Sequence, residues 1–317
     1  MAIQARQSLL AKVEAAYGTD PTPAGVDAVR CIGSLDYTFN SEDAEIESVD
    51  AFLDGYAHVE GSVFVTVSFE TPLWGSGAAG TAPEIGPLFK ACGMDEVIVG
   101  ATSVTYQPTS AFGAGAAGYQ SNTFYIQDST LQFQVHGVYG TFSIDASVSS
   151  FPKVSWSFTG LYERPTDVAA ITAPTYDATR PAPCRGLTFQ YAGITPRCTN
   201  WTLDLQREVH RVGDFGSTFG VAGFELGRCS PAGTFRVQER AIATENFWTV
   251  DTPVASHWSL TFGSTAGNIC TITRPGGTGG IKFQNLSRGE DNGIITLDMA
   301  YSIGRNAGND ALELVFT

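Results

Sequence analysis

Two stretches of the chain carry the same alternation of apolar and polar positions. Residues 35–40 read Leu-Asp-Tyr-Thr-Phe-Asn, and residues 201–206 read Trp-Thr-Leu-Asp-Leu-Gln. A period of two predicts a strand with one buried and one exposed face. Each stretch is followed by a polar loop, a glycine and a second alternating strand, at residues 61–69 and 233–238. We therefore expect the same hairpin twice, as part of a duplicated β domain.

The ends of the two halves also resemble each other. Residues 131–134 are similar to residues 281–284, and residues 154–158 share their alternation with residues 295–299. The Asn292-Gly293 pair before the last of these strands is a strong signal for a tight turn. Further strands are expected at residues 103–106 and 124–127.

Helical periodicity is weaker and local. Residues 4–17 are predicted to form a short helix with an apolar stripe and with Gly18 as its stop. The stripe consists of Leu9, Leu10, Val13 and Tyr17. A prolyl segment that includes Pro21 then leads into an extended arm, which is expected to dock on its own domain or on a neighbour.

A second helix is predicted after a glycine-rich loop, with Thr81 as N-cap, Pro83 in the first turn and Gly93 as its end. Its expected buried stripe is Ile85, Leu88, Phe89 and Cys92. The equivalent helix of the second half is weak and falls at residues 244–250. Residues 174–183 contain three prolines and separate the halves. The predicted organisation is mainly β, with an N-terminal arm at 1–30 and two β-sandwich or barrel domains at 31–175 and 176–317.

Composition supports a folded chain, because 43% of the 317 residues are hydrophobic and 16% are charged. The first residues lack a signal-peptide pattern and no apolar stretch reaches membrane-spanning length, so we expect a soluble protein without a membrane anchor, made in a cytoplasm. The six cysteines lie far apart and are expected to be free thiols.

The net charge of −14 opposes binding to a phosphate backbone, which requires Lys and Arg. Residues 1–176 hold 19 acidic and 6 basic residues, whereas residues 177–317 hold 13 and 12. This asymmetry fits either an acidic solvated face or two halves that meet different surroundings in an assembly.

Motifs of catalysis are weak. Residues 75–80 satisfy G-x-G-x-x-G, but the pattern recurs at Gly113, Gly115 and Gly118 in another loop, so a flexible loop is favoured over a nucleotide site. The histidines (His58, His136, His210 and His257) lack metal-ligand spacing. We find no nucleophile elbow and expect neither a cofactor nor an enzyme.

The loop after the first repeated strand is acidic, with Glu42, Asp43, Glu45, Glu47, Asp50 and Asp54. It lacks the glycine and the spacing of a calcium loop. Calcium binding or paired catalytic carboxylates are the alternatives to a solvated or intersubunit loop. The second copy of the loop carries Arg207, His210 and Arg211 instead, and opposite charges suit contacts between loops in an assembly.

Three segments resemble the tail tube (major tail) proteins of long-tailed bacteriophages. These are residues 10–21, the expected helix at residues 83–93, and residues 137–162 with their glycines and closing aromatic strand. The resemblance implies a β-sandwich or barrel with a flanking helix, stacked as six-membered rings into a hollow tube that conducts genomic DNA. Because the domain is present twice, it implies a trimer with pseudo-sixfold symmetry.

The resemblance also implies a virion location and three protein partners, namely the tape measure, the tail terminator and the distal tail protein. Candidate ring-to-ring or intersubunit residues are the six acidic ones of the loop, Arg207, Arg211, Tyr17 and Pro21. A carbohydrate-binding or receptor-binding β-sandwich of a virion is the alternative function, and exposed aromatic platforms would favour it.

Overall fold

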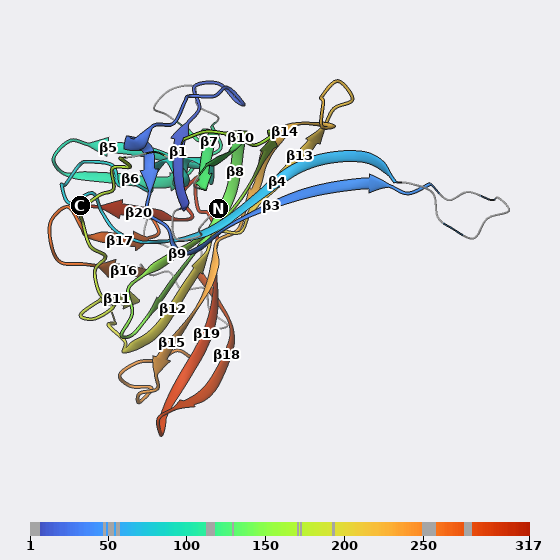
Figure 1. The fold of residues 1–317 in the computed structure, drawn as a ribbon. Coiled ribbons are helices and arrows are strands. Elements are labelled where there is room, and N and C mark those ends of the chain that lie inside the picture. Colours follow the sequence, from blue (N-terminus) through green and yellow to red (C-terminus); the bar gives the residue numbers. More distant parts are fainter. Residues whose placement is uncertain are drawn as a thin grey trace.

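The computed structural model describes residues 7–46, 49, 54, 58–111, 118–128, 130–169, 171, 173–191, 194–248, 258–275 and 281–317. Almost all regular structure in this part of the chain is antiparallel β-sheet, in two main layers (Figure 1). The mainly-β fold class predicted from the alternation is thereby confirmed.

Eight strands run side by side and form what we call the long sheet. Its order is β3-β4-β9-β8-β12-β15-β19-β18. The strands of the first half are β3 (Ile32–Ala44), β4 (Val59–Pro72), β9 (Lys153–Tyr162) and β8 (Leu131–Ser147). Those of the second half are β12 (Cys198–Asp204), β15 (Ala232–Gln238), β19 (Ile294–Ile303) and β18 (Ile281–Asp291).

The predicted repeat of the strands at residues 35–40 and 201–206 is present in both order and register. Leu35 lies opposite Phe69, and Trp201 lies opposite Phe235. The predicted match of residues 154–158 with 295–299 is displaced by two residues, because Trp156 lies opposite Phe69 and Met299 lies opposite Phe235. In each half the second strand then pairs with the fourth, and the fourth with the third. The halves meet where β8 pairs with β12, so one sheet runs through both. The domain boundary near residue 175 stays a prediction.

A second layer of six strands, the cross sheet, also draws on both halves. Its order is β5-β6-β20-β17-β16-β11. The bounds are β5 (Met94–Val99), β6 (Ser103–Pro108), β20 (Glu313–Phe316), β17 (Cys270–Thr273), β16 (Trp258–Phe262) and β11 (Thr188–Tyr191). One apolar core fills the space between the sheets, with aromatic contacts such as Phe89–Phe142 at 5.2 Å and Phe189–Phe235 at 5.3 Å.

The helix predicted at residues 4–17 is wrong where the structure describes it. Residues Gln7–Val13 form strand β1, which pairs with β7 (Asn122–Asp128) and β2 (Ala28–Val29). Leu9, Leu10 and Ala11 are all buried, because the strand is covered on both faces. A continuous apolar run cannot be told from a helical stripe by its period alone. The short η2 (Gly25–Asp27) and β10 (Thr166–Asp167) complete this region.

The second predicted helix exists but is shorter. Helix α1 spans Gly86–Ala91, with Ile85 rather than Thr81 at the N-cap position and no side-chain cap. The expected stripe is buried, and Gly93 adopts a φ of +81°, which suits the residue after a helix. In the second half, residues 244–248 form a turn and irregular chain instead of the expected helix, and residues 249–250 lie outside the described part.

The Asn292-Gly293 turn is confirmed. It joins β18 to β19, and both residues have positive φ, +53° and +81°, as a tight hairpin turn requires. All six cysteines are free thiols, as predicted, and three of them (Cys92, Cys184 and Cys270) are buried.

Candidate assembly surfaces

The long sheet ends in two open edges. Within the described chain β3 pairs with β4 alone, and β18 pairs with β19 alone. Open edges present unpaired N–H and C=O groups that can accept a further strand. The two edges lie at opposite ends of the layer (Figure 1).

Burial along β3 differs from burial along its counterpart β12. Trp201, Leu203 and Leu205 are fully buried. The equivalent residues of β3 are only partly covered, and the Phe39 side chain is 50% exposed. The difference follows from position, since β12 has a neighbour on each side and β3 has one. The apolar row of β3 is thus suited to a contact that the single chain does not supply.

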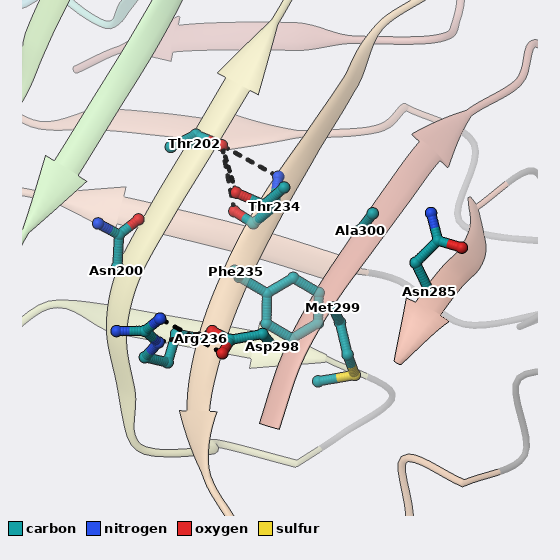
Figure 2. A pocket seen from close by; sticks show the side chains of 9 residues that line it. All are labelled: Asn200, Thr202, Thr234, Phe235, Arg236, Asn285, Asp298, Met299 and Ala300. Atoms are coloured by element: carbon teal, nitrogen blue, oxygen red, sulfur yellow. Dashed lines mark hydrogen bonds and ion pairs between the residues drawn. The ribbon is translucent and has the colours of Figure 1, made fainter. Parts of the chain in front are cut away.

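One face of the long sheet is polar except where Phe64, Tyr139 and Leu161 pack in a separate apolar cluster. In the first half it carries short side chains such as Thr38, Ser68, Thr141 and Ser157. In the second half it forms a shallow hollow (Figure 2), where the Thr202 and Thr234 hydroxyls lie 2.8 Å apart. The hollow is lined by Asn200, Thr202, Thr234, Phe235, Arg236, Asn285, Asp298, Met299 and Ala300.

Two cations on this face are held by carboxylates. The Arg236 guanidinium donates to both Asp298 oxygens, at 2.5 and 3.3 Å (Figure 2), and the Lys153 ammonium lies 3.5 Å from Glu70. Asp36 and Asp145 are exposed on the same face. The face therefore offers polar and acidic groups with its charged arginine already neutralised.

The acidic loop sits at the far end of the β3–β4 hairpin, which extends out of the body (Figure 1). Glu42, Asp43, Glu45 and Asp54 are exposed, and Glu47 and Asp50 lie outside the described residues. The Arg211 guanidinium lies 2.6 Å from a Glu42 oxygen. The predicted attraction between the two loops is therefore realised inside one chain, and a role between subunits stays a prediction.

Arg211 comes from a hairpin that continues the second repeat, β13 (Arg207–Gly213) and β14 (Val221–Cys229). Arg207 at its base donates to three carbonyls, those of Cys92 at 3.2 Å, Gly93 at 3.0 Å and Gly227 at 3.1 Å. Its guanidinium thus ties the hairpin to the end of α1. A contact of Arg207 with another subunit remains a prediction.

Tyr17 fixes the same hairpin to the arm. Its hydroxyl accepts the Phe224 N–H at 2.6 Å and donates to the Gly137 carbonyl at 3.2 Å. Burial raises the pKa of Tyr17 to about 12. Beside it, the buried Glu14 carboxylate accepts hydrogen bonds from the Gly18 and Gly137 amides and from two hydroxyls. The arm from Gln7 onward therefore docks on its own chain, where Pro21 is half-buried. A contact of Tyr17 or Pro21 with another subunit stays a prediction.

The glycine motif at residues 75–80 serves a packing role that its pattern did not reveal. The Gly75 amide donates to the Asn268 side-chain oxygen and the Gly77 amide to the Gly267 carbonyl, each at 2.9 Å. A Cβ on Gly75 would lie 2.1 Å from the Gly267 oxygen. Close approach of two backbones explains the glycines, and the loop is docked on the second half rather than free.

A family model described as phage tail tube protein matches residues 4–303. The chain belongs to the phage tail tube protein family. No curated protein shows a significant match to it. As a tail tube protein it is a structural component of the virion that assembles with copies of itself.

Several features of this tail tube protein bear on other functions. The described residues contain no cluster of three or more His, Cys, Asp or Glu that could hold a metal ion. None of the described helices is long and apolar enough to cross a membrane. Trp156 and Trp201, whose exposure would favour a carbohydrate-binding platform, are buried in the core.

Proposed function

We propose that three copies of this tail tube protein close into a ring with pseudo-sixfold symmetry, and that rings stack into the tail tube through which the genomic DNA is ejected. The observation that carries the proposal is the seam between β8 and β12. There, the third strand of the first repeat pairs with the first strand of the second repeat.

The same pairing can be repeated between molecules. The free strands are β18, which is the third strand of the second repeat, and β3, which is the first strand of the first repeat. If β18 of one copy pairs with β3 of the next, every repeat makes the same contact with its neighbour. A head-to-tail contact of this kind closes into a ring.

Strand direction is compatible with closure. The eight strands of the long sheet alternate in direction, because every pair in it is antiparallel. An even number of alternating strands leaves the two edge strands running in opposite directions. A second copy in the same orientation can therefore add an antiparallel partner, and three copies would make a closed sheet of 24 strands.

The internal seam also predicts the register of this contact. Asp204 lies opposite Ser143 at the seam. By the pairing registers of the two repeats, Thr38 of β3 is equivalent to Asp204 of β12. Ser287 of β18 is likewise equivalent to Ser143 of β8. We therefore expect Thr38 of one copy to lie opposite Ser287 of the next, and both are exposed in the single chain.

Disulfide trapping tests this register. The double variant Thr38→Cys/Ser287→Cys is assembled and oxidised, and it is expected to give covalent dimers and trimers on a non-reducing gel, while each single variant stays monomeric. Rings with threefold averaged density in electron micrographs would support the proposal. Discrete particles without rings, or an absence of cross-linked species, would exclude it.

In such a ring the polar face of the long sheet would line the lumen, because the other face packs against the cross sheet. Of the cations on this face, Arg236 and Lys153 are paired with carboxylates and Lys282 is exposed. The exposed carboxylates would repel the DNA backbone, so that DNA moves through the lumen without binding to the wall. Asp298→Ala would release the Arg236 guanidinium. We expect assembled Asp298→Ala tubes to retain DNA fragments at low salt that wild-type tubes do not retain, and equal retention would contradict this role.

The far end of the β3–β4 hairpin is proposed to contact the next ring, and the tape measure, tail terminator and distal tail proteins are proposed as further partners. The exposure of Glu42, Asp43 and Glu45 at the far end of the β3–β4 hairpin, which extends out of the body, supports a contact between rings. Replacing residues 46–57 with a short glycine-serine turn should leave single rings that fail to stack. Tubes of normal length from this variant would contradict the role of the loop.

A further inference from the structure

The two ends of the long sheet present different surfaces. At one end the β3–β4 hairpin extends out of the body (Figure 1). The β8–β9 turn, residues 148–152, lies at the opposite end, because Lys153 at the start of β9 pairs with Pro72, where β4 ends. In a ring closed by β18–β3 pairing, these two ends would form the two faces of the ring. Each ring would thus present its projecting hairpins on one face and its β8–β9 turns on the other.

A polar hollow of about 380 Å³ lies at the end with the β8–β9 turn. It is formed by Arg180 and Arg185 of the segment between the repeats and by residues 263–265 of the β16–β17 loop. The Cys184 amide donates to the carbonyl of Ser150 in the β8–β9 turn at 2.8 Å. This hydrogen bond fixes the segment, and with it the hollow, at this end of the sheet.

The two arginines of the hollow carry uncompensated charge. Both are exposed, and neither guanidinium has a carboxylate partner in the described part of the chain. By contrast, Arg236 and Arg288 of the long sheet are each paired with a carboxylate. The Asn268 side-chain amide donates to the Arg180 carbonyl at 2.8 Å, so the backbone of the hollow is held in place. Two guanidinium groups without a counter-ion favour a carboxylate partner, which they bind with charge-assisted hydrogen bonds.

The projecting hairpin at the other end carries uncompensated charge of the opposite sign. Residues 31–89 contain no Lys or Arg. Glu42 is paired with Arg211, whereas Asp43 and Glu45 are exposed and have no cationic partner among the residues that the structure describes. These two carboxylates therefore remain available for a partner outside the chain.

We propose that the hollow of Arg180 and Arg185 receives Asp43 and Glu45 of a copy in the adjoining ring. This inference rests on the proposed stacking of rings, and it adds the surface that receives the hairpin. Charge complementarity selects this occupant, because a guanidinium pair on one face would meet a carboxylate pair on the other.

Position in the sheet makes the contact one between copies. The hairpin tip and the hollow lie at opposite ends of the same strands, so they cannot meet within one chain. Copies stacked in the same orientation bring the two ends together. The contact is head-to-tail and therefore continues from ring to ring without closing.

Charge reversal tests the contact in the full chain. The variants Arg180→Glu/Arg185→Glu and Asp43→Lys/Glu45→Lys change exposed side chains only. Each variant alone is expected to form rings but to give tubes at least about tenfold shorter than wild type in electron micrographs, because like charges then face each other. Arg228→Glu reverses an exposed arginine outside the hollow and should give tubes of wild-type length.

An equimolar mixture of the two kinds of ring is the decisive sample. The lysine hairpins of one variant would meet the glutamate hollows of the other, and the unchanged hairpins would meet the unchanged hollows. Tubes of alternating rings are therefore expected from the mixture. Long tubes from either variant alone, or a mixture that forms none, would overturn the contact.

A neutral variant provides a second readout. Arg180→Gln/Arg185→Gln removes the charge without repulsion, so its tube growth should depend less on salt than that of wild type. An unchanged salt dependence would also overturn the contact.

Cross-linking separates this inference from the ring itself. Thr38→Cys/Ser287→Cys cross-links in both charge-reversed backgrounds, without tubes from their mixture, would overturn the hollow as the receiving surface and leave the ring standing. Absence of these cross-links in otherwise wild-type protein would overturn the ring, whatever the mixture does.

Discussion

The two repeats begin with the same hairpin and end it differently. In the first, β3 and β4 stay paired as one continuous ribbon from Leu35–Phe69 to Glu42–Ser62. In the second, the register of β12 and β15 continues unchanged into Arg207–Cys229 of β13 and β14, yet the ribbon bends between them. Beyond this point the register shifts at nearby places in the two hairpins, between Glu42 and Ala44 and between Arg207 and Val209.

The bend has local causes. Gln206 adopts a φ of +50°, which a residue with a side chain rarely takes, and Pro231 on the opposite strand has no amide to donate. Beyond the bend, the β13–β14 hairpin lies against the β3–β4 hairpin, where the Val63 amide donates to the Phe219 carbonyl at 3.0 Å. The first repeat thus has a projecting β3–β4 hairpin, and the second has a β13–β14 hairpin that packs against it.

The largest change in stability is expected at Arg207, at the base of the β13–β14 hairpin. Arg207→Ala removes three hydrogen bonds from a charged donor and should lower the free energy of unfolding by about 3 kcal/mol, as measured by urea denaturation of the unassembled chain. Arg228 on the same hairpin is exposed, and Arg228→Ala should change stability by less than about 0.5 kcal/mol. Equal losses would show that Arg207 does not anchor the hairpin.

The second-largest change in stability is expected at Tyr17, whose hydroxyl hydrogen-bonds the β13–β14 hairpin. Tyr17→Phe leaves the Phe224 amide without its acceptor and should cost about 1–2 kcal/mol of unfolding free energy. Tyr37→Phe is the matched control, because the Tyr37 hydroxyl is buried with no hydrogen-bond partner among the described residues, so its loss should be close to neutral. A larger loss in the control than in Tyr17→Phe would contradict the pinning role.

A smaller change of opposite sign is expected at the bend. Gln206→Gly relieves a left-handed conformation and should stabilise the chain by about 0.5–1 kcal/mol, measured by thermal or urea unfolding. Gln190→Gly makes the same replacement in strand β11 and should destabilise. If Gln206→Gly also destabilises, the bend is held by its packing rather than imposed on the backbone.

The smallest effect belongs to the ion pair between the two hairpins. The Arg211 guanidinium holds the pKa of the Glu42 carboxyl below its usual 4.5. A lowered pKa stabilises the fold above the unfolded-state pKa, and this contribution is lost as the pH falls through the lowered value. The stability difference between wild type and Glu42→Gln should therefore be greater at pH 7 than at pH 3, and should shrink with added salt. A difference that is independent of pH would contradict the pairing.

Local patterns predicted the strands of both repeats well. The alternation at residues 35–40 and 201–206 and the Asn292-Gly293 turn depend on neighbours in the sequence, so they can be recognised without a partner. The β1 strand could not, because its partner β7 is more than one hundred residues away and its buried run has no alternation. The spacing of Leu9, Leu10, Val13 and Tyr17 instead favoured the apolar stripe of a helix.

The assembly role of the candidate residues stays a prediction. Opposite charge in the two loops suggested contacts in an assembly, and the structure pairs Glu42 with Arg211 within one chain. Their meeting within one chain depends on the bend at Gln206, for which the sequence offers only Pro231 as a signal. The seam between β8 and β12 has no signal at all, since a repeat in sequence does not say whether the copies share a sheet.

The β8–β12 seam has a consequence for how a tube could grow. Both strands belong to one polypeptide, so this pairing forms at a rate that does not depend on protein concentration. In a ring of three chains, half of the junctions between repeats would be complete as soon as each chain folds. Only three molecules would need to associate to form a ring. The rate of assembly would therefore depend less steeply on protein concentration than in a tube built from single-repeat subunits.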